Sequence, residues 1–229
     1  MANNVLKVNG IAIASIAKIN GQTDSALAKL NGEEFTGTPA DAHVFIASDL
    51  ASKGDGSHAS LGFTSGIDST YDVYEFVYTN IHGETDRAQF CFQVEVGEGT
   101  TYEQTITSTF FYAYHYESGS GQNLQYYASS DQAQGDALQH LSIFPDFTQG
   151  DSSVSGKLTL YAPSSGDYVK HFMSETNNRG DAGGEAFYSV NAFSAGNINT
   201  TTAVTRIKFA FDSGEIQGGA IKMYGIAKS

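Results

Sequence analysis

The sequence predicts an all-β protein, an antiparallel β-sandwich of the jelly-roll type that is preceded by a short N-terminal repeat segment. From residue 42 onward apolar and polar side chains alternate with a period of two, as they do in strands that bury one face. The runs are rich in Thr, Tyr, Phe, Val and Ile, and turns rich in Gly, Ser and Asp separate them. Because no helical crossover pattern is present, a sandwich is favoured over an α/β fold.

The clearest strand covers residues 87–96, where apolar residues occupy alternate positions, so we expect one buried and one wetter face. Residues 71–79 precede it, and a turn over 80–84 makes the two runs a predicted hairpin. Helix is expected only in a few turns, at 23–30 or 131–139. The apolar side of the clearest strand consists of Ala88, Phe90, Phe92, Val94 and Val96. The other predicted strands are 42–47, 105–116, 138–144, 156–162, 167–173, 187–193, 202–211 and 220–226.

The composition excludes several classes of protein. The chain has 12 Lys and Arg residues against 25 Asp and Glu residues, a net charge of −13, so it repels nucleic acid. Hydrophobic residues make up 40%, enough to build a core, which argues against global disorder. Charged residues make up only 16%, which argues against a coiled coil. The one cysteine, Cys91, forms no intrachain disulfide and is interpreted as an ordinary strand residue.

Residues 8–37 form three imperfect units that begin eleven residues apart. Each unit opens with an aliphatic residue followed by Asn-Gly, the strongest tight-turn dipeptide. The three evenly spaced turns predict short strands, or single helical turns, that fold back on themselves. The dipeptides are Asn9-Gly10, Asn20-Gly21 and Asn31-Gly32.

The repeat is too short to bury its own aliphatic side chains, so something must cover them. Either they pack on the main body of the same chain or they pack on other subunits. We favour assembly with other subunits, because a linker-like stretch follows at residues 36–41. We therefore predict an N-terminal assembly anchor over residues 1–38 and a displayed β-sandwich domain over 39–229. The candidate anchor residues are Val8, Ile11, Ile13, Ile16, Ile19, Leu27 and Leu30.

Catalytic motifs are absent from the sequence. The histidines lack the spacing of metal ligands, and neither a Gly-x-Ser-x-Gly elbow nor a Walker loop occurs. We therefore predict no catalytic residue, no metal site and no cofactor. Two of the many acidic residues could still pair in space as in a glycosidase, and this alternative stays open. The histidines are His43, His58, His82, His115, His140 and His171.

One aromatic stretch, residues 110–116, is a candidate binding surface. Because side chains alternate across a strand, Tyr112, Tyr114 and Tyr116 share one face with Phe110. A row of tyrosines can stack on sugars, and it can equally form a core or a subunit interface. We favour the core or interface interpretation and keep these tyrosines as a possible glycan or interface face.

Three parts of the β-rich region, residues 71–115, 155–173 and 199–225, resemble a group of virion proteins of marine tailed bacteriophages. The opening repeat, residues 8–37, is similar to N-terminal segments of phage structural and fibre proteins. The resemblance covers nearly the whole chain. It implies a virion component, described in this group as a structural or tail-fibre protein, and it supplies no catalytic residues.

We therefore expect a non-enzymatic structural component of a phage virion, either a fibre or appendage subunit or a capsid decoration. Alternatives are a receptor-binding module for a host glycan and an enzyme that degrades surface polysaccharide. Expected partners are other virion proteins and further copies of the chain, with a homotrimer favoured. We expect no nucleic-acid or membrane partner. The N-terminus lacks a signal-peptide pattern, so we expect assembly in the host cytoplasm and a final place on the virion exterior.

Overall fold

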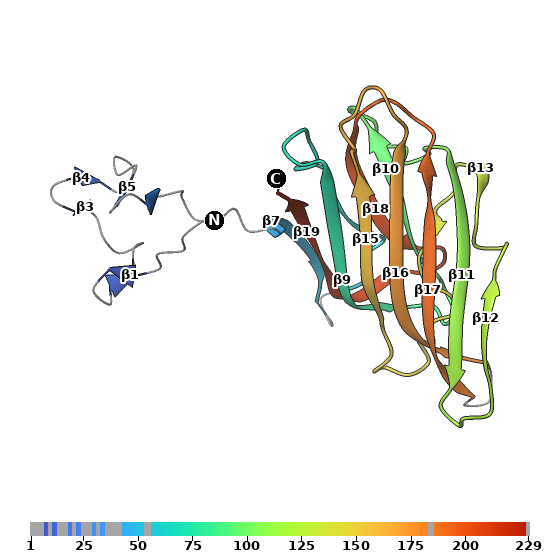
Figure 1. Cartoon of the computed structure of the whole chain (residues 1–229). Helices are drawn as coiled ribbons and strands as arrows, with labels where there is room; N and C mark the ends of the chain where they lie inside the picture. The colour runs from blue at the N-terminus through green and yellow to red at the C-terminus, as the bar shows by residue number, and fades with distance from the viewer. Residues whose placement is uncertain are drawn as a thin grey trace. The chain divides into compact units, whose positions relative to one another are not determined.

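The structure, a computed structural model, describes residues 43–52, 56–182 and 186–227 and six two-residue strands between residues 7 and 34. The chain divides into two compact units, residues 1–44 and 45–229. The boundary predicted from the sequence, between residues 38 and 39, lies a few residues earlier. Figure 1 labels the strands along the chain.

The strands of the first unit form three hairpins. In each hairpin two residues separate the innermost pair, Val8 and Ile11, Ile19 and Gln22, or Leu30 and Glu33. The separating residues are the three Asn-Gly dipeptides, so the strand form of the predicted repeat is confirmed. The strands are β1 (Lys7–Val8), β2 (Ile11–Ala12), β3 (Lys18–Ile19), β4 (Gln22–Thr23), β5 (Lys29–Leu30) and β6 (Glu33–Glu34).

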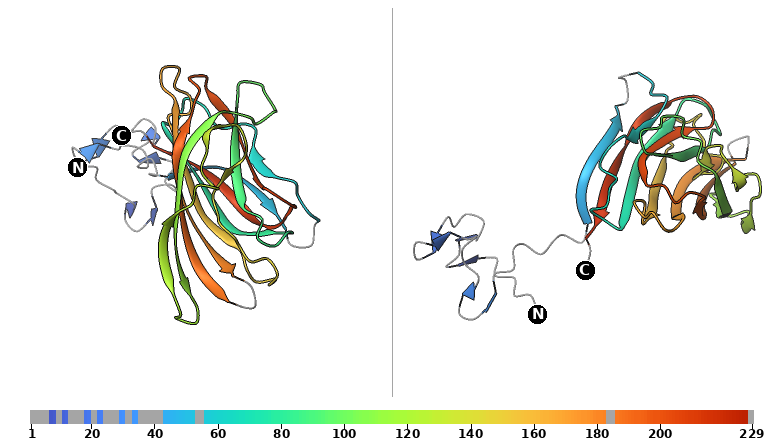
Figure 2. Two further views of the ribbon diagram at one scale, coloured as in Figure 1. Left: turned by 90° about the vertical axis from the view of Figure 1, so that its right-hand side faces the viewer. Right: turned by 90° about the horizontal axis from the view of Figure 1, so that it is seen from above.

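The second unit is an antiparallel β-sandwich, as predicted. A nine-stranded sheet has the order β12-β11-β17-β16-β15-β9-β19-β7, with β13 paired to β11. A four-stranded sheet, β14-β10-β18-β8, packs against it, and Figure 2 shows the two layers. The large sheet contains β7 (His43–Ala51), β9 (Val73–Gly83), β11 (Ile106–Tyr116), β12 (Gln122–Tyr126), β13 (Ala133–Gly135), β15 (Val154–Tyr161), β16 (Lys170–Asp181), β17 (Phe187–Ile198) and β19 (Ile216–Ile226). The small sheet contains β8 (Leu61–Phe63), β10 (Phe90–Val96), β14 (Gln139–His140) and β18 (Val204–Phe211).

Two local predictions are wrong. The segments 71–79 and 87–96 do not form a hairpin, because β9 continues to Gly83 and pairs with β15 and β19. The next strand, β10, belongs to the other sheet and pairs with β14 and β18. The helix predicted at 131–139 is also wrong, since the short strands β13 and β14 lie there. The described residues contain no helix at all, and residues 24–28 of the other expected helix lie outside them.

The hydrophobic core fills the space between the two sheets. Phe92 of the small sheet meets Phe172 of the large sheet edge to face, with ring centroids 4.9 Å apart. Phe209 and Phe76 make a similar contact at 5.7 Å. All four rings are almost completely inaccessible to solvent. The period-two apolar face predicted for these strands is therefore the face that joins the sheets.

The small sheet is buried on its polar face as well, contrary to the wetter face predicted for the strand over 87–96. Gln93 and Glu95 of β10 are 0% and 2% exposed. The Gln93 amide donates hydrogen bonds to three backbone carbonyls, those of Gln104, Asp136 and Ala137, at 3.0–3.1 Å. The loops before and after β11 thus cover the second face of the small sheet. The polar side chains of β10 supply hydrogen-bond partners to backbone groups of these loops.

Candidate functional site

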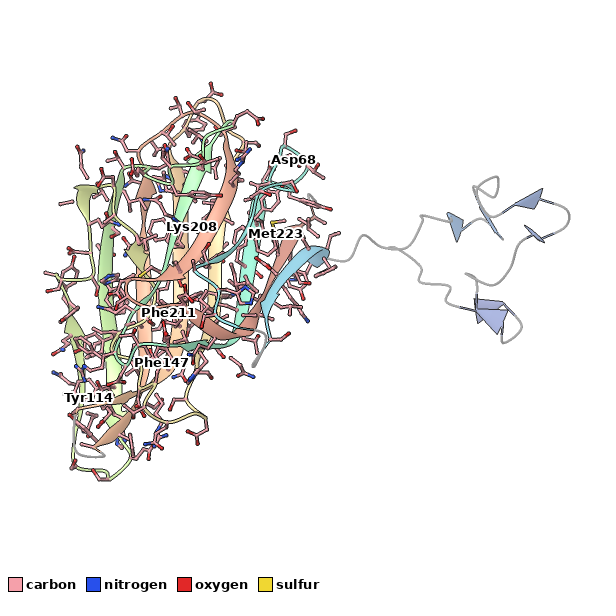
Figure 3. The ribbon with its side chains drawn as sticks, turned by 180° about the vertical axis from the view of Figure 1, so that it is seen from behind. Asp68, Tyr114, Phe147, Lys208, Phe211 and Met223 are labelled. Atoms are coloured by element: carbon pink, nitrogen blue, oxygen red, sulfur yellow. The ribbon has the colours of Figure 1, made fainter. Side chains whose placement is uncertain are left out.

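The three tyrosines singled out in the sequence lie on the inner face of β11, toward one end of the large sheet. Tyr112 is buried, at 6% exposure, whereas Tyr114 and Tyr116 are half-buried. Tyr114 lies near the lower end of the strands in Figure 3, far from the core residue Met223. The alternation of β11 therefore places the three rings on one face, as expected, and exposes two of them in part.

A fourth tyrosine, Tyr188 of β17, completes a group that we call the tyrosine cluster: Tyr112, Tyr114, Tyr116 and Tyr188. Tyr188 is the register partner of Tyr116, and the two ring centroids lie 5.3 Å apart. Tyr114 lies 5.6 Å from Tyr116 and 5.7 Å from Tyr188. Such tilted aromatic pairs stabilise each other beyond the area they bury. Sequence analysis missed Tyr188, because nothing in the chain indicated that β17 would pair with β11.

Loop residues close one side of the cluster. The Tyr127 ring contacts both Tyr112, at 5.9 Å, and Phe144, at 5.5 Å. The Arg87 guanidinium lies 4.6 Å from the centre of the Phe144 ring and donates a hydrogen bond to the carbonyl of Asp181. These contacts hold the loops against the end of the sheet, where the small sheet supplies no strand.

The hydroxyl groups of Tyr112 and Tyr188 stay protonated at neutral pH. Burial raises the pKa of Tyr188 to about 12, and burial also raises the pKa of Tyr112. The Gln125 amide donates a hydrogen bond to the Tyr112 hydroxyl. Tyr112 and Tyr188 therefore act as packed supports. Tyr114 and Tyr116 can present ring edges and hydroxyl donors to a ligand or a protein partner.

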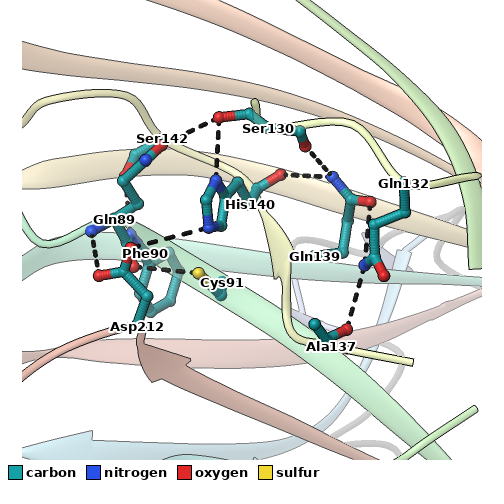
Figure 4. A network of polar contacts seen from close by, with 10 residues as sticks. All are labelled: Gln89, Phe90, Cys91, Ser130, Gln132, Ala137, Gln139, His140, Ser142 and Asp212. Atoms are coloured by element: carbon teal, nitrogen blue, oxygen red, sulfur yellow. Dashed lines mark hydrogen bonds and ion pairs between the residues drawn. The ribbon is translucent and has the colours of Figure 1, made fainter. Parts of the chain in front are cut away.

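A second polar site, shown in Figure 4, brings together Ser130, His140 and Asp212. The Nδ1 atom of His140 lies 2.9 Å from Ser130 Oγ, and Nε2 lies 3.7 Å from Asp212 Oδ2. Sequence analysis missed this arrangement, because the three residues follow no local motif. It has the residue types of a hydrolase triad, so its geometry decides what it can do.

The burial and the hydrogen bonds of Ser130 differ from those of the serine in a triad. Ser130 is 2% exposed, and its hydroxyl donates to Gln89 Oε1 at 3.2 Å. The one hydroxyl proton is then directed at Gln89, whereas a nucleophilic serine donates its proton to the histidine. Burial lowers the pKa of His140, and the charge of Asp212 opposes this only in part. Ser130 Oγ is thus buried away from solvent and bonded to Gln89.

The same network fastens the two sheets together. The Gln139 side chain, on edge strand β14, accepts a hydrogen bond from Ser108 Oγ of β11 at 2.6 Å. Its amide donates to the Ser130 carbonyl at 2.9 Å and to Ser194 Oγ of β17 at 3.3 Å. Gln139 is completely buried. These bonds satisfy polar groups that would otherwise be costly to bury, and they fix the loop that closes the tyrosine cluster.

A groove of about 350 Å³ crosses the outer face of the large sheet from β9 to β17. Its polar side chains are paired with other groups of the large sheet. The Lys157 ammonium lies 3.5 Å from Glu75, and the Asn191 amide donates to Glu175 at 3.2 Å. The groove offers amide and carboxylate groups to a polar ligand.

The predicted anchor residues lie only partly within the described chain. Val8, Ile11, Ile19 and Leu30 belong to the hairpin strands. Ile13, Ile16 and Leu27 lie outside the described residues. The anchor assignment stays a prediction.

Within the described part of the chain, no three His, Cys, Asp or Glu side chains gather closely enough to hold a metal ion. Nor does any helix in that part have the length and apolar character needed to cross a membrane. No protein-family model, no curated protein and no solved structure matches this chain.

Proposed function

We propose that the protein is a non-enzymatic structural component of a bacteriophage virion, a fibre, appendage or capsid-decoration subunit anchored by its N-terminal hairpins. The observation that carries the proposal is the division of the chain into a hairpin repeat and a separate β-sandwich. Pairs of two-residue strands are too small to enclose a core, so the aliphatic residues of the repeat need a partner surface. Because the sequence resembles marine phage virion proteins, we take the virion as the source of that partner surface.

The sandwich is the displayed part in this proposal. Its acidic excess keeps displayed copies soluble on a particle exterior. Several copies assemble as a homo-oligomer, with a trimer favoured, because repeated subunits adopt closed symmetry. The chain is made in the host cytoplasm and joins other virion proteins there.

Glycan recognition is the second candidate function, in which the sandwich binds a sugar of the host surface. The observation that favours it is the partial exposure of Tyr114 and Tyr116 at the end of the large sheet. A tyrosine ring with a free hydroxyl suits a sugar, which offers both C–H faces and hydroxyl groups. This function is compatible with the first.

The anchor is tested in the full-length chain by changing Ile11, Ile13 and Ile16 to Ser. We expect the variant to lose incorporation into the particle while the sandwich keeps its thermal unfolding temperature. Residues 39–229 alone should likewise fold and fail to attach. Normal incorporation of either protein would contradict the anchor. If residues 39–229 cannot fold, the repeat belongs to the core of the same chain and the proposal fails.

Glycan binding is tested on an array of host-type glycans with the wild type, Tyr114→Ala and Tyr116→Ala. Tyr168→Ala is the matched control, because Tyr168 is a surface tyrosine outside the cluster with 73% exposure. We expect binding to fall in the two cluster variants and to persist in the control. An equal loss in all three variants, or no binding by the wild type, would refute this function.

A further inference from the structure

We propose that copies of this chain pack against one another through the outer face of β12, β11 and β17, which we call the uncharged face. The inference rests on the homo-oligomer of the proposed function and names a surface for it. A self-complementary face pairs two copies about a twofold axis, so this inference takes a dimer in place of the favoured trimer. Along these strands the outward residues alternate with buried residues such as Phe110 and Val190. The outward residues are Gln122, Leu124, Tyr126, Thr107, Thr109, Phe111, Ala113, His115, Ser189, Asn191, Phe193, Ala195 and Asn197.

Exposed apolar side chains concentrate on this face. Among the described residues seven large hydrophobic side chains are exposed, and four of them lie on the face or at its border. The strand register places Tyr126, Phe111 and Phe193 in one row across the three strands. Leu124 follows Tyr126 two positions away on the same side of β12, and Met173 of β16 is paired with Ala195 of β17. The exposures are 40% for Phe111, 65% for Leu124, 55% for Tyr126 and 56% for Met173.

The face carries no formal charge. None of its outward residues is Asp, Glu, Lys or Arg, although the chain has 25 acidic and 12 basic residues. Charges begin at its border. There the Tyr126 hydroxyl donates to the Asp131 carboxylate, Glu175 is the register partner of Phe193, and Arg179 lies 3.4 Å from Glu117. Protein interfaces have the same arrangement, an aromatic and charge-depleted centre inside a polar rim.

A second copy of this chain is the occupant that fits the face. A net charge of −13 makes copies repel each other, and the repulsion is weakest where the surface is uncharged. Thr, Asn and Gln side chains both donate and accept hydrogen bonds, so the face is complementary to itself.

The size of the face suits a dimer contact of modest strength. Eleven residues over the two strand widths of β11 and β17, with the five residues of β12 beside them, give a flat footprint of roughly 430 Å² per copy. The projecting side chains of Phe111, Leu124, Tyr126 and Met173 add to it. A contact of this size lies at the lower end of specific interfaces.

The test introduces a charge into the full-length protein by Leu124→Glu. Leu50→Glu is the matched control, because Leu50 is 55% exposed on β7, at the opposite edge of the same sheet. Both side chains are exposed, so thermal unfolding should show that both variants fold. In sedimentation, Leu124→Glu should raise the dissociation constant roughly a hundredfold, because an unpaired carboxylate would be buried in the contact. Leu50→Glu should leave the dissociation constant unchanged.

Thiol labelling gives an independent readout of the same contact. The native Cys91 is completely buried, so it does not react in the folded protein. In the oligomer Leu124→Cys should react with a maleimide about tenfold more slowly than Leu50→Cys, as expected for a covered side chain. The difference should vanish on dilution to the monomer.

The possible results separate this inference from the wider proposal. An oligomer whose position 124 labels freely, or that Leu124→Glu leaves intact, refutes the face but leaves the homo-oligomer standing. If Leu50→Glu raises the dissociation constant as much as Leu124→Glu does, association depends on total charge, and the uncharged face is not the contact surface. A protein that is monomeric at all concentrations refutes both the face and the homo-oligomer, while virion attachment is judged by the anchor variants alone.

Discussion

Replacing Glu95 with Gln should destabilise the sandwich strongly, because this buried carboxylate organises the loop after β10. Glu95 Oε1 accepts hydrogen bonds from the Val96 backbone N–H at 2.9 Å and the Gln104 amide at 3.1 Å. Oε2 accepts from the Tyr102 backbone N–H at 2.8 Å and Thr101 Oγ at 3.1 Å. Burial by itself would raise the pKa of Glu95, but these donors outweigh it and lower the pKa.

The size of the effect follows from those four bonds. A glutamine keeps one acceptor oxygen and turns the other into an NH₂ group that faces two donors. The Thr101 hydroxyl and the Gln104 amide can reorient, whereas the backbone N–H of Tyr102 or Val96 cannot. One charge-assisted bond is therefore lost and one buried donor is left unsatisfied, a cost of about 2–4 kcal/mol. For a domain of this size the unfolding temperature should fall by roughly 5–15 °C.

The control is Glu98→Gln, in the same loop, because the Glu98 side chain is fully exposed. This variant should unfold like the wild type. The pH dependence provides a second check. Since folding lowers the pKa of Glu95, its contribution is complete above the ordinary carboxyl pKa and is lost as the pH falls through the folded value. Urea unfolding should show the difference between wild type and Glu95→Gln at pH 7, and the difference should shrink in acid. Equal stability of the two Gln variants at pH 7 would refute the reasoning.

Two further predictions concern packed tyrosines. Burial raises the pKa of Tyr78 to about 12, so its contribution is complete below pH 10 and is lost between about pH 10 and 12. Over that range urea unfolding of the wild type should lose about 3 kcal/mol more than Tyr78→Phe, and parallel curves would contradict this. A Cβ on Gly180 would lie 2.5 Å from the Tyr188 ring, so Gly180→Ala should cost about 1–3 kcal/mol through displacement of that ring. Gly166→Ala, where a Cβ meets nothing within 4 Å, is the control, and matching unfolding temperatures would show that the ring moves freely.

The sequence predicted strands well where one face is apolar and the strand is long. It predicted β9, β11, β16 and β17 within a few residues at their starts, because their period-two pattern reflects burial against the other sheet. It missed β12, because the sequence QNLQY is mostly polar and its two apolar residues, Leu124 and Tyr126, lie on the exposed side of an edge strand.

Pairing and burial of polar residues could not be read from the pattern. The predicted hairpin of 71–79 with 87–96 assumed that neighbouring strands pair, but the chain crosses to the other sheet after Gly83. Gln93 and Glu95 look like solvent-facing residues in sequence. Glu95 is buried by the loop that directly follows β10, which supplies its hydrogen-bond partners. Gln93 also bonds the carbonyls of Asp136 and Ala137, a segment that only the folded chain brings close.

The candidate site shows the same division. Alternation placed Tyr112, Tyr114 and Tyr116 on one face, which the structure confirms. It could not identify Tyr188, which is brought beside Tyr116 by the pairing of β11 with β17. The pairing of strands that are distant in sequence thus determines which tyrosine rings are packed and which are partly exposed.

The unequal sizes of the two sheets explain why both candidate surfaces lie on β11. A four-stranded sheet covers only part of the inner face of a nine-stranded one, so loops complete the cover at the tyrosine cluster. On β11 the even-numbered residues of this end face that cluster, and the odd-numbered ones, Phe111 among them, form the uncharged face. The chain enters the sandwich through β7, at the opposite end of the strand order, about 30 Å away by the usual strand spacing. In the proposed arrangement, a sandwich that is anchored through the chain before β7 would leave β11 and β12, at the far edge of the sheet, accessible to a neighbouring copy or a host glycan.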